Sequence, residues 1–544
     1  MGPMKHFWRI IPGTALIVFA AALPLVHAQE EKAAAAPEAE EVKPPADSRY
    51  KGMASCASCH RQQLSQQLDE EQTREFCLLN ETLVFRSDET HSRAHRRLNE
   101  DLGQRMAKKL GYDVSSDQRC LSCHSGWVLH QQKPPSFQSG VTCEICHGPS
   151  ADWREPHYDS AWRKKLIDEK KKLGMIEVRE PMRRAQLCYS CHIGNSDEGK
   201  VVSHEMYAAG HPPLPSIEIE TFVAAMPAHS RKLEEKGDFE FRKEFMAANR
   251  TGASAQTPDE LPRTKGVLVG GLMALRESLN LFAKQSGPNK GTEFALFDCQ
   301  ACHHELRVPA WRQTRLSQGK PGRPRLPEWP TVLAEIAVAQ VEPDAKVLQV
   351  KLKELADAMG EKPFGGSRKV QEILSGDGKS DAGLIGWLDM RAQALAGRPF
   401  SKGDAKRALN ALYALGSNEV HDFHSARQIA WAIRAIETEI QLTYPTFPQR
   451  VANLPLEKQR ENEENSIKIW KAWLEKDRKA AEDHSEKILG ELSKSLRLTL
   501  PAGQKTSVSA SLGSFLETSA GYDPEKFKKL LQDSARLSGH GAAK

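Results

Sequence analysis

The sequence predicts a mainly α-helical protein with two parts, an N-terminal half with little regular structure and an all-helical C-terminal domain. Residues 50–310 are rich in Gly, Pro, Cys and His and contain few long periodic segments. After Trp311 no cysteine remains, and Ala, Leu, Lys and Glu dominate, which is the composition of packed helices. With 544 residues, the chain is long enough for two to four domains of ordinary size.

The first residues have the pattern of a secretory signal peptide. Lys5 and Arg9 precede an apolar stretch over residues 10–25, and Val26-His27-Ala28 follows as a small-residue cleavage site. This pattern predicts a cleaved signal peptide over residues 1–28, and hence a periplasmic or otherwise exported protein. An uncleaved N-terminal anchor is the alternative. No later segment is apolar enough to suggest a membrane span, so we expect none in the mature chain.

Residues 29–49 consist mainly of Ala, Glu and Pro. This composition cannot form a core, so we expect a disordered linker between the signal peptide and the folded protein. The formal net charge is +5, and no basic motif accompanies it. The sequence therefore predicts no nucleic-acid partner.

One motif, Cys-x-x-Cys-His, occurs five times and uses ten of the eleven cysteines. The motif cysteines are Cys56, Cys59, Cys120, Cys123, Cys143, Cys146, Cys188, Cys191, Cys299 and Cys302. Each motif is followed by the histidine that completes it, namely His60, His124, His147, His192 and His303. The remaining cysteine, Cys77, lies in an apolar setting and is expected to be a buried free thiol.

This motif is the attachment signature of a c-type haem, in which two thiols bind one porphyrin and the histidine is the proximal iron ligand. Zinc sites and disulfides also use Cys-x-x-Cys pairs. Zinc sites would combine the motifs in twos and would not need a histidine after each one, and a disulfide framework would not repeat one spacing five times. The sequence therefore predicts five covalently bound haems c per chain and a pentahaem cytochrome domain over residues 50–310.

The C-terminal region, residues 311–544, contains several amphipathic helix patterns. Ser425 and Gln428 have the spacing of a capping box, and they precede isoleucines at helical period, namely Ile429, Ile433, Ile436 and Ile440. Two more helices are predicted around Leu384, Trp387 and Leu388 and over residues 467–492. Residues 267–285 predict a helix that leads to the fifth motif. We expect the C-terminal domain to be a scaffold or docking surface, since it has no concentrated set of titratable groups.

Histidines outside the motifs are candidates for the sixth iron ligand. Two axial histidines give a low-potential electron carrier, whereas an iron without a sixth ligand can bind a small molecule. The main candidates are His91, His157, His204, His211 and His304, and weaker ones are His95, His130, His229, His421 and His424. The spacing alone does not assign them to individual haems.

Residues 50–230, about a third of the chain, resemble the cytochrome c-554 family, tetrahaem cytochromes related to hydroxylamine oxidoreductase. The matching segments are the first motif, Thr90-His91-Ser-Arg-Ala94, and the run Gly140-Val-Thr-Cys143-Glu-Ile-Cys146-His147-Gly148-Pro149. The fifth motif and the helical region lie outside the resemblance.

The resemblance implies a ligand for most haems of this core. It implies that His91 caps the third haem, that His157 caps the first, and that His204 or His211 caps the fourth. It also implies that the second haem, held by His124, has no sixth ligand.

These features predict an electron carrier that uses five haems and exchanges electrons with other redox proteins. One alternative is an oxidoreductase acting on a small nitrogen or sulfur compound at an open iron of His124. Pentahaem nitrite reductases use Cys-x-x-Cys-Lys at the active haem, and every motif here ends in His. A second alternative is a haem-bearing assembly subunit of a respiratory complex.

Overall fold

A computed structural model of the chain describes residues 49–61, 78–127, 137–230, 260–287, 292–303, 323–344, 346–362, 367–377, 382–419, 421–442 and 522–537. Within these ranges the chain forms helices and no strands, apart from one isolated bridge between Asn195 and Lys200. The predicted mainly α fold is therefore confirmed. The predictions for residues 1–28, most of 29–49, Cys77, His130, His304 and the helix over residues 467–492 lie outside the described residues.

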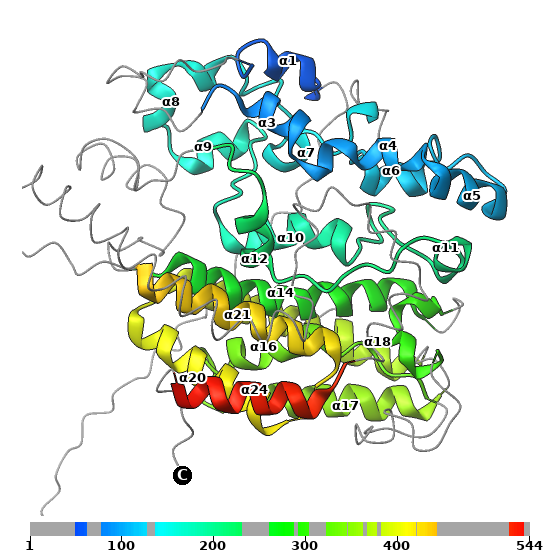
Figure 1. Cartoon of the computed structure of the whole chain (residues 1–544), viewed down its shortest axis with the longest axis vertical. Helices are drawn as coiled ribbons and strands as arrows, with labels where there is room; N and C mark the ends of the chain where they lie inside the picture. The colour runs from blue at the N-terminus through cyan, green and yellow to red at the C-terminus, as the bar shows by residue number, and fades with distance from the viewer. Residues whose placement is uncertain are drawn as a thin grey trace, which may run out of the picture. The chain divides into compact units, whose positions relative to one another are not determined.

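The N-terminal half is built from short helices joined by turns (Figure 1). These are α1 (Met53–Ala57), α3 (Glu81–Ser87), η2 (Thr90–Arg93), α4 (Ala94–Leu98), α5 (Asp101–Leu110), α6 (Gln118–His124), η3 (Phe137–Ser139), α7 (Cys143–His147), η4 (Pro156–Tyr158), α8 (Ser160–Lys164), α9 (Ile167–Lys172), α10 (Pro181–His192), α11 (His204–Ala209) and α12 (Ile219–Ala225). Each of the first four motifs lies on a helix or at its end, and the fifth lies on η7 (Cys299–Ala301), after η6 (Phe294–Leu296).

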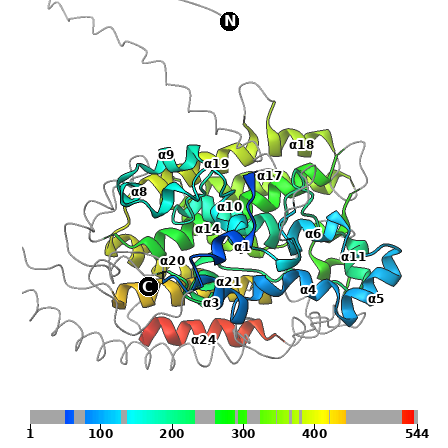
Figure 2. The ribbon, with the colours of Figure 1, turned by 90° about the horizontal axis from the view of Figure 1, so that it is seen from above.

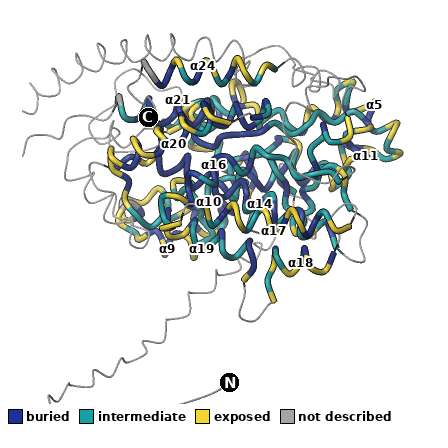
Figure 3. Tube along the Cα trace, turned by 90° about the horizontal axis from the view of Figure 1, so that it is seen from below, coloured by how far each residue is buried: buried dark blue, intermediate teal, exposed yellow. Residues whose placement is uncertain are grey.

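Longer helices form the rest of the described chain. They are α14 (Pro262–Gln285), α16 (Trp329–Val338), α17 (Val347–Glu361), α18 (Arg368–Ser375), α19 (Gly383–Gly397), α20 (Lys402–Asn418), α21 (Phe423–Leu442) and α24 (Pro524–Leu537). The buried segments concentrate on α14, α16 and α21, whereas α24 packs against α20 with one face exposed (Figures 2 and 3). Leu384 and Leu388 are buried on α19, as their spacing predicts, and Trp387 is partly buried beside them.

Helix α14 is the centre of the core. It packs against α10 and α12 of the motif region and against α16, α19 and α21 of the helical region. Gly271 permits the close crossing with α16, because a Cβ at this position would lie 2.3 Å from Cβ of Leu333. Among the described residues, the two regions therefore share one apolar core.

By length and composition α14 is also a candidate membrane span. Its most apolar 18-residue segment has a mean hydropathy of 1.2. The expectation that no segment after the signal peptide is apolar enough to span a membrane is therefore wrong by hydropathy alone. The structure gives another reason for the apolar sequence, since 72% of this window is buried against other helices. A helix that is hydrophobic on all sides is typical of a protein core as well as of a membrane.

Two carboxylates cap the starts of helices in this core, one from a distant part of the sequence and one from the residue next to the helix. Glu439 of α21 accepts hydrogen bonds from the backbone N–H groups of Arg263 and Thr264, each at 2.6 Å, and so caps α14. At the start of α21, Asp422 accepts a hydrogen bond from the N–H of Ser425 at 2.7 Å. The predicted cap residue, Ser425, therefore lies inside the helix, because α21 begins three residues earlier than its capping-box spacing suggests.

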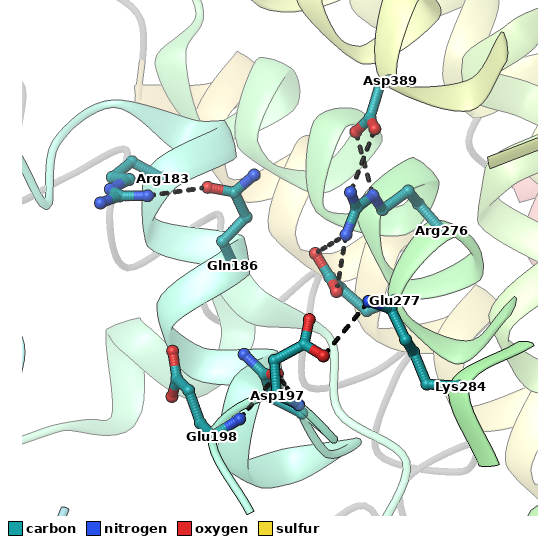
Figure 4. A network of polar contacts seen from close by, with 9 residues as sticks. Arg183, Gln186, Asp197, Glu198, Arg276, Glu277, Lys284 and Asp389 are labelled. Atoms are coloured by element: carbon teal, nitrogen blue, oxygen red, sulfur yellow. Dashed lines mark hydrogen bonds and ion pairs between the residues drawn. The ribbon is translucent and has the colours of Figure 1, made fainter. Parts of the chain in front are cut away.

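A network of charged groups joins α14 to its neighbours (Figure 4). The guanidinium of Arg276 donates to both carboxylate oxygens of Asp389 on α19, at 3.0 and 3.1 Å, and to Glu277 at 3.0 Å. About two turns further along α14, Lys284 donates a hydrogen bond to Asp197, close after the fourth motif, at 3.2 Å. These contacts fix α14 between the helical region and the segment that follows the fourth motif.

Candidate haem sites

Each motif histidine faces a second histidine from elsewhere in the chain. The ring centroids lie 6.1 Å apart for His60 and His157, 6.3 Å for His192 and His91, 6.4 Å for His124 and His211, 6.4 Å for His147 and His229, and 6.2 Å for His303 and His204. Five different sequence separations therefore give nearly the same distance. A common distance at all five motifs indicates a common chemical purpose.

This distance fits two imidazoles that bind one metal ion from opposite sides. A metal–imidazole bond is about 2 Å long, and the ring centre lies about 1.1 Å behind the nitrogen, so two such rings have centroids about 6.3 Å apart. The residues of all five sites thus fit an iron held between two axial histidines, with the motif cysteines beside it for covalent attachment.

The second ring nitrogen of most of these histidines is held by the protein. Nδ1 of His124 lies 2.7 Å from the carbonyl oxygen of Ala94, and Nδ1 of His211 lies 2.7 Å from that of Pro212. Nδ1 of His229 lies 3.1 Å from the carbonyl oxygen of Pro227. A carbonyl can only accept, so Nδ1 carries the proton and Nε2 keeps its lone pair for a metal.

Two sites use a carboxylate in place of a carbonyl. Oε2 of Glu81 lies 2.8 Å from Nδ1 of His60, and Oε1 of Glu89 lies 2.9 Å from Nδ1 of His91. Both carboxylates are largely buried. These two carboxylates orient the imidazoles and add a negative charge next to the first and fourth sites.

Burial also keeps the inner histidines neutral. Burial lowers the pKa of His147, His192 and His211 to about 4 in each case. The imidazoles are therefore unprotonated at neutral pH, which is the form that binds metal ions.

The structure pairs some histidines differently from the family resemblance. His157 faces His60 of the first motif, as the resemblance implies. His91 faces His192 of the fourth motif rather than the third, and the third motif faces His229. This arrangement arises because η2 lies close to the end of α10, while the segment after α12 reaches α7.

Helix α11 and the turn after it contribute two of the second histidines. His204 begins α11 and faces His303 of the fifth motif, and His211 follows the helix and faces His124 of the second. The two positions expected to compete for the fourth haem therefore lie at two other sites. The second site, expected to lack a sixth ligand, has a histidine at the same distance as the other four.

The remaining described histidines have other surroundings. His95 is buried, with Nε2 3.3 Å from the carbonyl oxygen of Ser115. His421 lies in the helical core, 3.4 Å from Glu328, and His424 lies 3.3 Å from Ser216. His229 was a weaker candidate because no sequence signal marks it, although it lies at the end of the resembling region.

Contacts between motif cysteines give the spatial order of the sites. The thiol of Cys56 lies close to that of Cys143, and the thiol of Cys123 lies close to that of Cys191. Cys146 lies near both Cys188 and Cys191. The first site therefore neighbours the third, the third neighbours the fourth, and the fourth neighbours the second.

Tyr207 of α11 connects the fifth site to this series. Its ring lies 5.9 Å from that of His211, at the second site, and its hydroxyl is close enough to Cys299 of the fifth motif to be affected by its charge. Burial raises the pKa of Tyr207 to about 12, so its phenol is neutral. The spatial order is thus first, third, fourth, second and fifth.

Comparison with known proteins agrees with this chemistry. The family model described as cytochrome c554 and c-prime matches residues 55–148, which include the first three motifs. Residues 55–148, less than a fifth of the chain, are thus similar to the cytochrome c-554 family. The match supports covalent binding of haem c in this part of the chain.

One curated relative is cytochrome c-554 of Nitrosomonas europaea, which is 22% identical over 160 residues. The match covers 27% of this chain and 59% of the relative, so the chain spans less than two thirds of the length of that cytochrome. No solved structure is significantly similar to the chain.

Proposed function

We propose that this cytochrome is an exported electron carrier with five covalently bound haems, each ligated by two histidines. The haems supply the redox chemistry, and the chain provides their attachment, axial ligands, orientation and burial. The observation that carries the proposal is the common spacing of the five histidine pairs, 6.1–6.4 Å between ring centroids.

The spatial order of the sites supports transfer from one end of the series to the other. The first and fifth motifs are the ends of the series, and each has one exposed cysteine, Cys59 and Cys302. The inner motif cysteines are only partly exposed. Two views agree that α8 and α9, next to the first site, lie on the opposite side from α11, next to the fifth (Figures 1 and 2). Electrons would enter at one end and leave at the other.

The position of His211 favours electron transfer over small-molecule catalysis. Catalysis at the second site needs an open coordination position on the iron held by His124. A second imidazole at 6.4 Å, with Nδ1 fixed by a carbonyl and a pKa near 4, is well suited to fill that position.

Export is the second part of the proposal. The positive N-terminus, the apolar stretch and the cleavage site over residues 1–28 support a signal peptide. An oxidising periplasm is also consistent with a chain whose ten motif cysteines all serve in thioether bonds.

The proposal is tested by counting haems and determining their spin states. The mass of the purified holoprotein should exceed that of the processed chain by five haems. Electron paramagnetic resonance of the oxidised protein should then show five low-spin ferric haems and no stoichiometric high-spin signal. A high-spin signal of about one haem in five in the wild-type protein would overturn the ligation at one site and favour a catalytic role.

Single-histidine variants assign the ligands. His211→Ala should convert about one fifth of the ferric haem to high spin, and so should His204→Ala and His229→Ala. His421→Ala is the matched control, because His421 is buried in the helical core and its hydrogen-bonding partners are Glu328 and Leu415. A fully low-spin His211→Ala protein would mean that another group ligates the second iron.

A further inference from the structure

The surface beside the first site combines apolar and basic side chains. Tyr158 is 71% exposed and Leu166 is 56% exposed, and they are two of the five large hydrophobic side chains with high exposure in the described parts of the chain. Tyr158 ends η4, and Leu166 lies between α8 and α9. Exposed apolar groups of this size next to a functional site are typical of interaction surfaces.

Tyr158 is in direct contact with the first site. Its ring lies 5.9 Å from the ring of His157, the histidine that faces His60. Its hydroxyl is also close enough to the exposed thiol of Cys59 for their charges to interact. A protein that covers Tyr158 would therefore lie against one of the two exposed ends of the series of sites.

The charge of this surface is positive. Residues 154–172 contain seven basic and four acidic side chains, a net charge of +3. Two of the basic groups are occupied, since Arg154 pairs with Glu155 and Lys171 lies 3.4 Å from Asp168. Lys170 is buried, with its ammonium 5.5 Å from the ring centroid of Trp162.

Three lysines on this surface remain available. Lys164 and Lys172 are exposed and Lys165 is partly exposed, and in the described structure none of the three has an ion-pair partner. They lie on or next to α8 and α9, the helices on either side of Leu166. Together with Tyr158 and Leu166 they form what we call the η4–α9 surface.

We propose that the η4–α9 surface is the docking site of a redox protein with an acidic face, which exchanges electrons with the first haem. This inference rests on the proposed function and assigns one end of the electron path. The lysines would steer the acidic partner during encounter, and the apolar side chains would hold it once docked. A transient redox complex requires only a small patch of this kind.

The experiment uses the holoprotein and reduced flavodoxin, an acidic one-electron donor, in stopped-flow mixing at low ionic strength. The charge-reversal variant is Lys164→Glu/Lys165→Glu/Lys172→Glu. The matched control is Lys526→Glu/Lys528→Glu/Lys529→Glu on α24, which makes the same change in net charge on a helix of the C-terminal region. We expect the second-order rate constant to fall at least about tenfold in the η4–α9 variant and less than about twofold in the control.

Two further measurements separate the apolar and the electrostatic contributions. In high salt, the charge-reversal variant and the wild type should react with flavodoxin at similar rates, because salt screens the attraction between the lysines and the acidic partner. Tyr158→Ser/Leu166→Ser should remain slower than the wild type at all salt concentrations. Equal rates for the η4–α9 variant and the control at low salt would overturn the inference.

Reduction by lumiflavin semiquinone, which is small and uncharged, tests the proposed function separately from the proposed docking site. If the wild type fails to pass electrons from lumiflavin to all five haems, the proposed function is wrong. If every variant is reduced by lumiflavin at the wild-type rate, and flavodoxin also reduces every variant at the wild-type rate, the proposed docking site alone is wrong. Binding of anionic lipid vesicles that is lost in the η4–α9 variant, without a change in flavodoxin kinetics, would assign the surface to a membrane instead.

Discussion

Glu81 and His60 form a buried carboxylate–imidazole pair at the first site, with Oε2 2.8 Å from Nδ1. The same carboxylate accepts a hydrogen bond from the backbone N–H of Leu79 at 3.2 Å, which fixes it in place. A negative charge held on the second ring nitrogen stabilises the ferric state of an iron bound to the first. Glu81 is therefore a positioning residue, and it would lower the reduction potential of a haem bound at the first site.

Glu81→Gln should raise the reduction potential of one haem and leave the others unchanged. A hydrogen bond to a charged group is stronger than one to a neutral group by about 1 kcal/mol, which corresponds to roughly 40 mV for a one-electron couple. Spectropotentiometric titration of the holoprotein measures this shift. Asp88→Asn is the control, because Asp88 is an exposed acid near the same sites that contacts no motif histidine. A titration of Glu81→Gln that overlays the wild type would exclude this role.

The angles between the histidine rings predict the magnetic properties of the haems. The paired rings are close to parallel at the first and fifth sites, at 14° and 25°, and close to perpendicular at the other three, at 84–89°. Parallel rings split the iron d orbitals that they share by π bonding, whereas perpendicular rings leave them nearly degenerate. The oxidised protein should therefore show two rhombic and three highly anisotropic low-spin signals. Five rhombic signals would contradict the ring orientations.

The sequence predicts the motif histidines and gives four of the five facing histidines as main candidates, but it does not predict which motif most of them face. The chemistry of haem attachment is local, since two cysteines and a histidine within five residues define it. The second ligand depends on tertiary approach, and His229 reaches His147 only because the chain returns past α7 after α12. The resemblance implies the approach of His157 to the first site, where the structure has it, but it does not imply that α11 and the turn after it provide histidines for two sites.

The helical region illustrates a similar limit. Periodicity predicted α14, α19 and α21, because a buried face leaves a repeating pattern in the sequence. Periodicity does not tell which helices share a core. The sequence therefore could not show whether the predicted domain boundary at residue 310 also separates two cores. The contact of Glu439 with Thr264 and the crossing of Gly271 with Leu333 join the two regions, and both depend on pairs far apart in the sequence.

Gly271→Ala should destabilise the protein. A Cβ at this position would overlap the side chain of Leu333, so α14 and α16 would have to separate, at a cost of about 1–3 kcal/mol. Gly403→Ala on α20 is the control. The nearest atoms to a Cβ there are 3.5 Å away, and alanine favours the helix by up to about 1 kcal/mol. Thermal unfolding followed by circular dichroism should show a lower midpoint for Gly271→Ala only. Equal midpoints for the two variants would mean that α14 and α16 leave room for a methyl group at residue 271, contrary to the structure.

The stability of the helical core should depend on pH through His421. This buried histidine lies 3.4 Å from Glu328 and 3.1 Å from the carbonyl oxygen of Leu415. Burial lowers the pKa of His421, but the hydrogen bond with Glu328 and the charge of that carboxylate outweigh it, so the pKa lies above the ordinary 6.5. Protonation therefore stabilises the folded state. This contribution is fully present below about pH 6.5 and is lost as the pH rises through the folded-state pKa.

Glu328→Gln should consequently lower the unfolding midpoint more at pH 5.5 than at pH 8.5. A partly exposed ion pair of this kind contributes about 0.5–1 kcal/mol, so the difference between the two pH values should be a few degrees at most. Glu354→Gln, on the exposed side of α17, is the matched control and should show no such difference. The double variant Glu328→Gln/His421→Gln should lose the pH dependence that the single variant changes, because both partners of the pair are then uncharged. If Glu328→Gln destabilises the protein equally at both pH values, the carboxylate acts only as a hydrogen-bond acceptor, and the charge of His421 has no part in holding α21 against α16.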